Sequence, residues 1–167
     1  EGKTFCAINL ASVFALSEKK TVLVGLDLRK PKIYDEFGIH NDYGVVNYLI
    51  GQSGIDDLVQ QSSNSHLDII TAGPVPPNPS ELILSEAMGR FFDALKQRYD
   101  YIVIDSAPLG LVTDTLNILP YTDATLFVVR QNYTKRQMMA LVNEKHQSRS
   151  IENISIVFNH VSSRRQP

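Results

Sequence analysis

The sequence has little of what marks a secreted or a nucleic-acid-binding chain. Its single cysteine, Cys6, cannot form an internal disulfide. The formal net charge is -2 at pH 7, and the basic residues are scattered apart from Arg29-Lys30 with Lys32 and a pair at Arg164-Arg165. Because no basic surface is indicated, we expect no nucleic-acid partner. The chain is expected to fold in the cytoplasm, where cysteines stay reduced.

Long apolar runs are also missing. No run approaches the ~18 residues of a membrane-spanning helix, and the first residues lack the pattern of a signal peptide. Cys6 lies in a short apolar run, which predicts a small buried core residue. The sequence begins without methionine and directly with helix-like residues, so it is interpreted as a fragment whose membrane anchor would lie elsewhere.

What the sequence has is an alternation of apolar strands and helices. Its 167 residues, 43% of them hydrophobic, suit one domain. Strands are expected at 21–26, 67–71, 101–104, 124–129 and 154–158. Helices are expected at 4–17, 45–50, 80–98 (as one or two), 113–119 and 134–149, the last with Thr134 as its N-cap. Strands that are apolar throughout indicate a mostly parallel sheet covered on both faces, a doubly wound α/β fold.

Ligands in doubly wound folds bind beyond the carboxyl ends of the strands. The residues that follow the expected strands are therefore the candidates for a site. They are Asp27, Arg29, Ala72-Gly73-Pro74, Asp105, Arg130 and Asn159. Two aspartates and two arginines on separate strands suit a site for phosphate and metal.

Gly2-Lys3-Thr4 matches the second half of the phosphate loop G-x-x-x-x-G-K-[ST]. In that loop the lysine reaches the β and γ phosphates, the threonine hydroxyl binds Mg²⁺, and the helix that follows points its positive end at the anion. The match is partial, and an exposed lysine at a helix start is the alternative. Its position at the opening of an apolar helix favours the phosphate loop.

Two aspartates each follow an apolar strand. Asp105 comes after 101–104 and is a candidate for holding Mg²⁺, although an aspartate there could also cap a helix. Asp27 comes after 21–26 and could accept a proton from an attacking hydroxyl or hold the metal, and Arg29 beside it could contact phosphate. A solvated turn of paired charges is the alternative for that segment.

Together with Gly2-Lys3-Thr4, the segments 22–31 and 101–108 resemble the bacterial tyrosine kinases of capsule and exopolysaccharide systems, which are similar to the partition-type P-loop ATPases. The proline-rich segment 72–82, AGPVPPNPSEL, is the most specific part of the resemblance and is not typical of the partition ATPases. The resemblance extends from Glu1 to about Ser162. It implies a P-loop NTPase type of fold that binds ATP and Mg²⁺.

The resemblance also implies roles for individual residues. Lys3, in the phosphate loop with Gly2, would bind the β and γ phosphates and assist catalysis. Asp27 would be the base for the tyrosine hydroxyl. The implied metal ligands are Thr4, Asp27 and Asp105, and the residues implied near the nucleotide base are Asn159 and Arg130.

The sequence departs from this family in several places. Many relatives carry an aspartate where this chain has Gly25. The first half of the phosphate loop, the strand before it, an arginine-bearing helix and a tyrosine-rich tail are absent from residues 1–167, which are interpreted as one fragmentary kinase domain. The absent strand would lie mid-sheet, so we expect this chain, when it is made alone, to be poorly stable or to repack. Either further residues precede Glu1 or the sheet has a gap.

The expected function is ATP-dependent tyrosine (auto)phosphorylation that regulates capsule or exopolysaccharide synthesis and export. The expected partners are neighbouring copies in a ring and a transmembrane adaptor or fused membrane domain, at the cytoplasmic face of the bacterial inner membrane. Two alternatives stay open: a partition-type regulatory ATPase, and a catalytically impaired nucleotide-binding domain of a polysaccharide exporter. A dinucleotide-binding dehydrogenase is rejected because no G-x-G-x-x-G follows an early strand.

Overall fold

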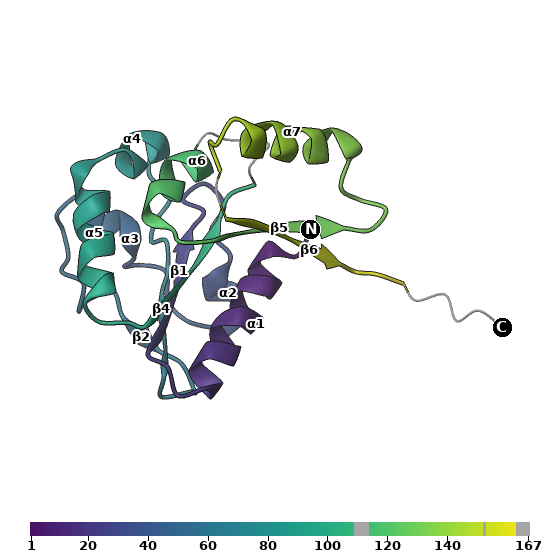
Figure 1. The fold of residues 1–167 in the computed structure, drawn as a ribbon. Coiled ribbons are helices and arrows are strands. Elements are labelled where there is room, and N and C mark those ends of the chain that lie inside the picture. Colours follow the sequence, from purple (N-terminus) through teal and green to yellow (C-terminus); the bar gives the residue numbers. More distant parts are fainter. Residues whose placement is uncertain (109–113, 152, 163–167) are drawn as a thin grey trace.

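A computed structural model of the protein describes residues 1–108, 114–151 and 153–162. Helices and strands alternate along the chain (Figure 1). The elements are α1 (Lys3–Leu16), β1 (Thr21–Leu26), α2 (Ile33–Phe37), α3 (Val45–Leu49), β2 (Gln60–Gln61), β3 (Leu67–Ile70), α4 (Pro79–Ile83), α5 (Glu86–Lys96), β4 (Tyr101–Ser106), α6 (Asp114–Ile118), the 3-10 helix η1 (Leu119–Tyr121), β5 (Thr125–Arg130), α7 (Arg136–Gln147) and β6 (Ile154–Asn159).

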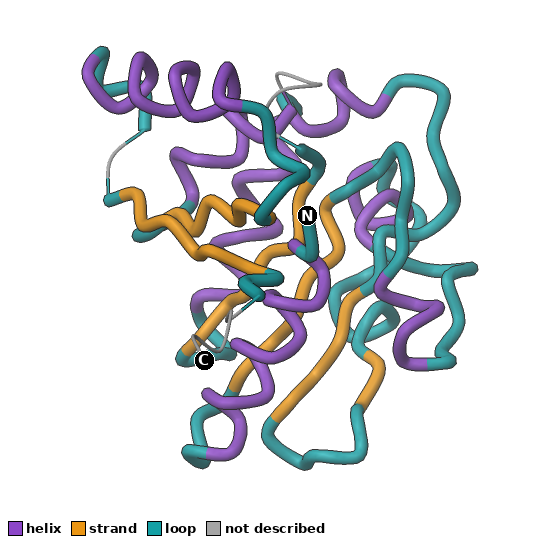
Figure 2. Tube along the Cα trace, turned by 90° about the vertical axis from the view of Figure 1, so that its right-hand side faces the viewer, coloured by secondary structure: helices purple, strands orange, loops and turns teal. Residues whose placement is uncertain are grey.

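The strands form two sheets. The larger sheet has the order β2-β3-β1-β4, and the smaller one pairs β5 with β6. β1 runs parallel to both β3 and β4, β5 runs parallel to β6, and β2 alone is antiparallel to its neighbour. The expected doubly wound, mostly parallel α/β fold is therefore confirmed. Figure 2 shows the strands in these two groups, with helices around them.

Within the described residues, β4 and β5 are not paired with each other, so the sheet is interrupted between them. This is the mid-sheet gap that the sequence predicts. Each of these strands leaves one row of backbone groups without a ladder partner at the interruption.

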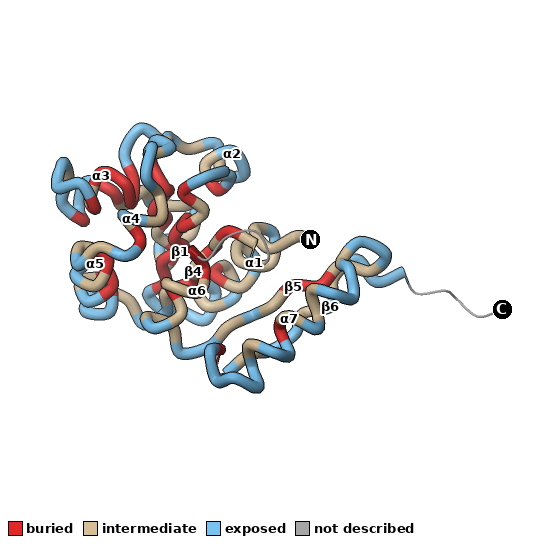
Figure 3. Tube along the Cα trace, turned by 90° about the horizontal axis from the view of Figure 1, so that it is seen from above, coloured by how far each residue is buried: buried red, intermediate tan, exposed pale blue. Residues whose placement is uncertain are grey.

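The core lies on both faces of β1. Val22, Leu23 and Val24 are all fully buried, and successive side chains of a strand point to opposite faces. Val22 and Val24 join the cluster that includes α3 and α5, whereas Leu23 joins the cluster that includes α1. Figure 3 shows the buried residues concentrated around these elements, while β5, β6 and α7 are mostly partly or fully exposed.

Several boundaries differ from the sequence-based expectation. The expected helix over 80–98 is two helices, α4 and α5. Residue 113, where the next expected helix begins, lies outside the described residues, as does the pair at 164–165. Thr134 is not an N-cap: its hydroxyl accepts a hydrogen bond from the backbone amide of Arg130, and α7 begins later, after Lys135. Cys6 is only partly buried, so its assignment to the core was wrong.

Three short elements were not predicted at all. They are α2, β2 and η1. Each is only two to five residues long, too short to show a periodic apolar pattern.

The segment before α3 is held tightly against the segment after β3. The amides of Val45 and Val46 donate to the carbonyls of Thr71 and Ala72, both at 2.9 Å. Gly44 lies so close that a Cβ atom there would come within 2.2 Å of the Gly73 nitrogen. This contact fixes the start of the proline-rich segment.

We predict that Gly44→Ala destabilises the protein by about 1–3 kcal/mol, because the added methyl group must displace backbone atoms. Gly54→Ala is the matched control, since a Cβ atom there has ordinary contact with Asp57 at 3.5 Å, and it should change stability by less than about 0.5 kcal/mol. The free energy of unfolding from urea denaturation measures both. Equal effects of the two substitutions would contradict the tight contact.

Candidate nucleotide and metal site

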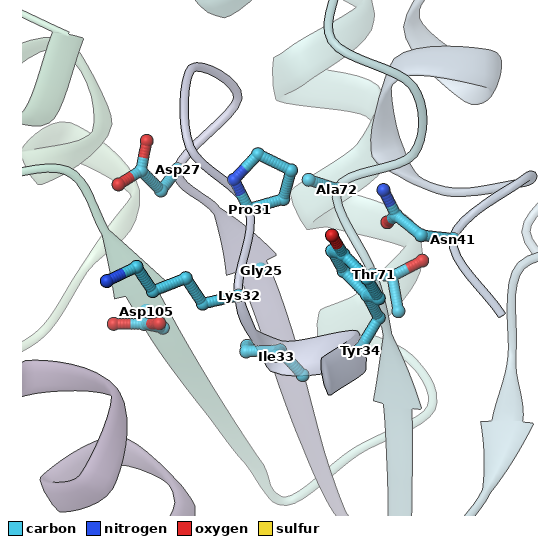
Figure 4. Close-up of a pocket in the computed structure, with 10 residues that line it drawn as sticks. All are labelled: Gly25, Asp27, Pro31, Lys32, Ile33, Tyr34, Asn41, Thr71, Ala72 and Asp105. Carbon is cyan, nitrogen blue, oxygen red and sulfur yellow. The ribbon is translucent and has the colours of Figure 1, made fainter. Parts of the chain in front are cut away.

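The two candidate aspartates meet at one edge of the larger sheet. The parallel register of β1 and β4 places Gly25 opposite Asp105 and Leu26 opposite Ser106. Asp27 directly follows β1, so its carboxylate and that of Asp105 line the same small pocket (Figure 4). The two aspartates that the sequence singled out therefore lie in one pocket.

Asp105 is bound to the first turn of α1. The hydroxyl of Thr4 donates to Oδ2 of Asp105 at 2.7 Å, and Asp105 is only 6% exposed. Burial raises the pKa of the Asp105 carboxyl above its ordinary value, although the hydrogen bond from Thr4 and the charge of Lys3 act in the opposite direction. The buried negative charge of Asp105 is thus incompletely compensated by the protein.

Gly2 begins α1 in a conformation that favours glycine. Its φ is 91°, and its carbonyl accepts the first helical hydrogen bond, from Cys6 at 3.0 Å. A Cβ atom at this position would lie 2.2 Å from Nδ2 of Asn159. Gly2 therefore lets the chain pass close to β6 and leaves the amino end of α1 directed at the site, as an anion-binding helix requires.

Asn159 lies beside Gly2. Its amide donates to the Glu1 carbonyl at 3.0 Å, and its neighbour across the small sheet is Arg130. The Arg130 guanidinium lies over the ring of Tyr133, 5.5 Å from the ring centroid. The structure thus places Asn159 at the phosphate-loop residues, with Arg130 on the adjacent strand.

Lys3 is the second residue of the partial phosphate loop. Its ammonium group forms an ion pair with Glu1 at 3.2 Å, and both side chains are partly exposed. An exposed pair of this kind contributes at most about 1 kcal/mol, so a bound phosphate could replace Glu1 as the partner of Lys3 at little cost.

The Asp27 carboxylate is oriented by its own loop. Oδ1 accepts hydrogen bonds from the amides of Arg29 at 3.3 Å and Lys30 at 3.0 Å. The side chain of Arg29, which the sequence suggested as a phosphate contact, donates to Oδ2 of Asp114 at 2.8 Å. Arg29 therefore helps to hold the loop that contains Asp27.

Lys32 is a site residue that the sequence analysis missed. It extends over Asp105 in Figure 4, and its charge acts to lower the pKa of that carboxyl. The only signal in the sequence is its position in a basic cluster close to Asp27. The residues that line the pocket are Gly25, Asp27, Pro31, Lys32, Ile33, Tyr34, Asn41, Thr71, Ala72 and Asp105.

The residues present fit a magnesium ion bound together with phosphates. The donors are a hydroxyl on Thr4 and carboxylates on Asp27 and Asp105, and Mg²⁺ prefers such oxygen ligands while keeping water and phosphate oxygens as the remainder. No group of three or more histidine, cysteine or acidic residues that could form a complete protein cage occurs in the described part of the chain. A cation would also offset the buried charge of Asp105.

A mostly parallel sheet, Gly-Lys-Thr opening a helix, and aspartates that end neighbouring strands together define a P-loop nucleotide-binding fold. Comparison with known proteins leads to the same class of fold. The profile of the AAA domain family matches residues 1–157. Tyrosine-protein kinase YwqD of Bacillus subtilis (strain 168) is 35% identical over 144 residues, which are 86% of this chain and 61% of YwqD.

Solved structures extend the comparison. The kinase domain of VpsO is 35% identical with a TM-score of 0.88, and the match covers 97% of this chain and 80% of that one. The septum site-determining protein MinD of Pyrococcus horikoshii OT3, crystallised with Mg-ADP, is 19% identical with a TM-score of 0.71 over 99% of this chain and 69% of that one, which shows a shared fold alone.

The chain belongs to the AAA domain family and, within it, to the bacterial tyrosine kinases. It spans less than two thirds of the length of YwqD, namely 61%. Among the helices of residues 1–108, 114–151 and 153–162, none has the length and apolar character to cross a membrane.

We predict opposite effects of Asp105→Asn on stability and on ligand binding. Because the pKa of Asp105 is raised in the folded protein, its charged form costs stability at neutral pH, and that cost disappears as the pH falls toward 3.8, the ordinary pKa of an aspartate. The ligand-free variant should therefore be more stable than the parent at pH 7, with a difference that shrinks in acid.

The same variant should bind Mg²⁺-ATP at least about tenfold more weakly, since it loses a carboxylate that we expect to hold the metal. Urea denaturation at several pH values and calorimetric titration with Mg²⁺-ATP measure the two effects. Asp93→Asn, which alters an exposed carboxylate on α5, is the control and should change neither. A loss of stability at pH 7 would contradict the raised pKa of Asp105.

Proposed function

We propose that the protein is an ATP-dependent protein-tyrosine kinase that acts on tyrosines of neighbouring copies. The observation that carries the proposal is the 2.7 Å hydrogen bond from Thr4 to Asp105, which joins the phosphate-loop helix to the aspartate that ends β4. Asp27 lines the same pocket as Asp105, and we infer that its carboxylate would meet the acceptor hydroxyl there.

Each of these residues has a distinct part in phosphoryl transfer. The amino end of α1 and Lys3 would bind the β and γ phosphates of ATP and stabilise the charge that develops on them. Thr4, Asp105 and Asp27 would hold Mg²⁺, which neutralises phosphate charge when it is bound. Asp27 would accept the proton of the tyrosine hydroxyl. Asn159 and Arg130 would lie near the base of the nucleotide.

The proline-rich segment 72–82 favours a kinase over a partition-type ATPase. This segment resembles that of the tyrosine kinases, and the hydrogen bonds of Val45 and Val46 with Thr71 and Ala72 hold its start in place. The named relatives YwqD and the VpsO kinase domain support the same choice. A switch ATPase would share Lys3, Thr4, Asp27 and Asp105 but would transfer the phosphoryl group to water.

The same resemblance suggests the pathway, the assembly and the cellular location of the complete protein. We propose that it regulates capsule or exopolysaccharide synthesis, that copies assemble in a ring, and that a transmembrane adaptor or fused membrane domain holds it at the cytoplasmic face of the inner membrane. One solved relative, the chimerical protein CapA2B2, is a fusion by its name, and this supports a partner component. Its match is 31% identical, with a TM-score of 0.90 over 96% of this chain and 71% of that one.

We predict that Lys3→Met in the complete protein lowers ATP-dependent phosphorylation of tyrosine about 100-fold or more, because the charge that stabilises the transferring phosphates is removed. Anti-phosphotyrosine blotting and phosphoamino-acid analysis after incubation with Mg²⁺-ATP measure the effect. Lys19→Met is the control, since Lys19 is an exposed lysine beyond the other end of α1, and it should retain full labelling.

The outcomes separate the candidate functions. Full labelling of the Lys3→Met protein would refute the kinase assignment of this site. Release of inorganic phosphate without phosphotyrosine in the parent would indicate the switch ATPase. If calorimetry detects no Mg²⁺-ATP binding by the parent, the impaired structural domain becomes the better description.

A further inference from the structure

A cluster of hydrogen bonds outside the phosphate site joins three loops at the same edge of the sheet. We name it the Asp114 cluster, after its members Asp114, Arg29 and Ser80. Nε of Arg29 donates to Oδ2 of Asp114 at 2.8 Å, and Nη2 of Arg29 donates to Oγ of Ser80 at 2.8 Å. The Ser80 hydroxyl in turn donates to Oδ1 of Asp114 at 2.7 Å. The three side chains thus form a closed ring of hydrogen bonds.

Asp114 is the buried centre of this cluster, only 2% exposed. Burial alone would raise the pKa of its carboxyl, but the hydrogen bonds from Arg29 and Ser80 outweigh burial and lower that pKa below its ordinary value. The carboxylate is therefore charged at neutral pH, and both of its oxygens are hydrogen-bonded. Charge-assisted bonds to a buried acceptor are among the stronger ones in proteins, so the position of Arg29 is well determined.

Arg29 links Asp114 to Asp27. The side chain of Arg29 is held by the cluster, while the backbone amides of Arg29 and Lys30 hold Oδ1 of Asp27. A shift of the Arg29 backbone would move both of these donors. The orientation of the Asp27 carboxylate consequently depends on an acid, Asp114, that lies 85 residues from Arg29 in the sequence.

The cluster also reaches the other two loops of the site. Ser80 is in the first turn of α4, within the proline-rich segment 72–82. Thr115, next to Asp114 in α6, donates its hydroxyl to the Ala107 carbonyl at 2.7 Å, just beyond the end of β4 and Asp105. The loops that follow β1, β3 and β4 are thereby tied to one buried carboxylate.

We propose that Asp114 is a positioning residue, which acts through Arg29 to fix the orientation of the Asp27 carboxylate and to couple it to the proline-rich segment. That this orientation serves transfer to a tyrosine hydroxyl rests on the proposed function. Asp114 contacts neither Lys3 nor Thr4 among the hydrogen bonds of the described residues, so these two residues keep their own contacts when Asp114 is replaced. Its loss should therefore slow the transfer step by a larger factor than it weakens binding of Mg²⁺-ATP, which Asp27 also contacts in the proposed function.

The test replaces Asp114 with asparagine in the complete protein, which keeps the shape and removes the charge. The expected result is a kcat for tyrosine phosphorylation about 10- to 100-fold lower, because small displacements of a reacting group have effects of that size, with a KM for ATP that rises by a clearly smaller factor. Amide hydrogen exchange at Arg29 and Lys30 should be roughly tenfold faster, since their acceptor is no longer held.

One pair of variants at Ser80 and one control variant keep the proposal testable if Asp114→Asn folds poorly. Ser80→Ala removes the hydroxyl that bonds Asp114, whereas Ser80→Thr retains a hydroxyl and should restore both kcat and the slow exchange. Asp93→Asn alters an exposed aspartate on α5 and should leave all three quantities unchanged.

Unchanged exchange at Arg29 and Lys30 in both Asp114→Asn and Ser80→Ala would overturn the positioning role. So would a kcat equal to that of the parent, or a KM for ATP that rises as much as kcat falls. If the parent protein phosphorylates no tyrosine, the proposed function fails, and the exchange comparison alone upholds or overturns the control of Asp27 by Asp114.

Discussion

The parallel pairing of β1 with β3 on one side and β4 on the other is the constraint on which the rest of the structure depends. β1 is buried along its whole length, so it can shift in neither direction without exposing apolar side chains or burying polar ones. Its register with β4 sets Asp27 beside Asp105, and its register with β3 brings the proline-rich segment to the same edge. The chemistry at that edge follows from the packing beneath it.

The sequence predicts those helices and strands whose burial is indicated by a local run of apolar residues. β1 is a short apolar run followed by Asp27, β4 is a mostly apolar run that reaches Asp105, and α1 opens within a Gly-Lys-Thr motif, so the existence of these elements and their relation to a phosphate site could be inferred. Family resemblance then assigned roles to Lys3, Thr4, Asp27 and Asp105. These roles could be assigned because each of the four residues lies in, or directly next to, a helix or strand that the sequence already predicts.

What the sequence could not show depends on contacts between distant segments. Arg29 and Asp114 pair across 85 positions, and no local pattern marks either residue as the partner of the other. Thr134 has a residue type that suits a helix N-cap, yet it bonds the Arg130 amide and lets α7 start later. Short elements such as β2 are formed by pairing with β3 rather than by any preference of two glutamines for extended structure.

Three aspartates at one edge of the sheet have different surroundings. Asp105 is buried with a single hydroxyl donor recorded for it, and its pKa is raised. Asp114 is equally buried but bonded by an arginine and a serine, and its pKa is lowered. Asp27 is held by backbone amides of its own loop. Three identical side chains thus differ in their environments, which suit the roles proposed for them: Asp105 as a cation ligand, Asp114 as a positioning residue and Asp27 as the group that meets the acceptor.

The contact between Glu1 and Asn159 has a consequence for the synthesis of the protein. It joins positions 158 residues apart, and β6 follows all the other strands of the described residues in the sequence. Because chains emerge amino end first, the larger sheet can assemble while Gly2 still lacks its neighbour. The contact at Gly2 would therefore form only after β6 has emerged from the ribosome, later than the hydrophobic core around β1.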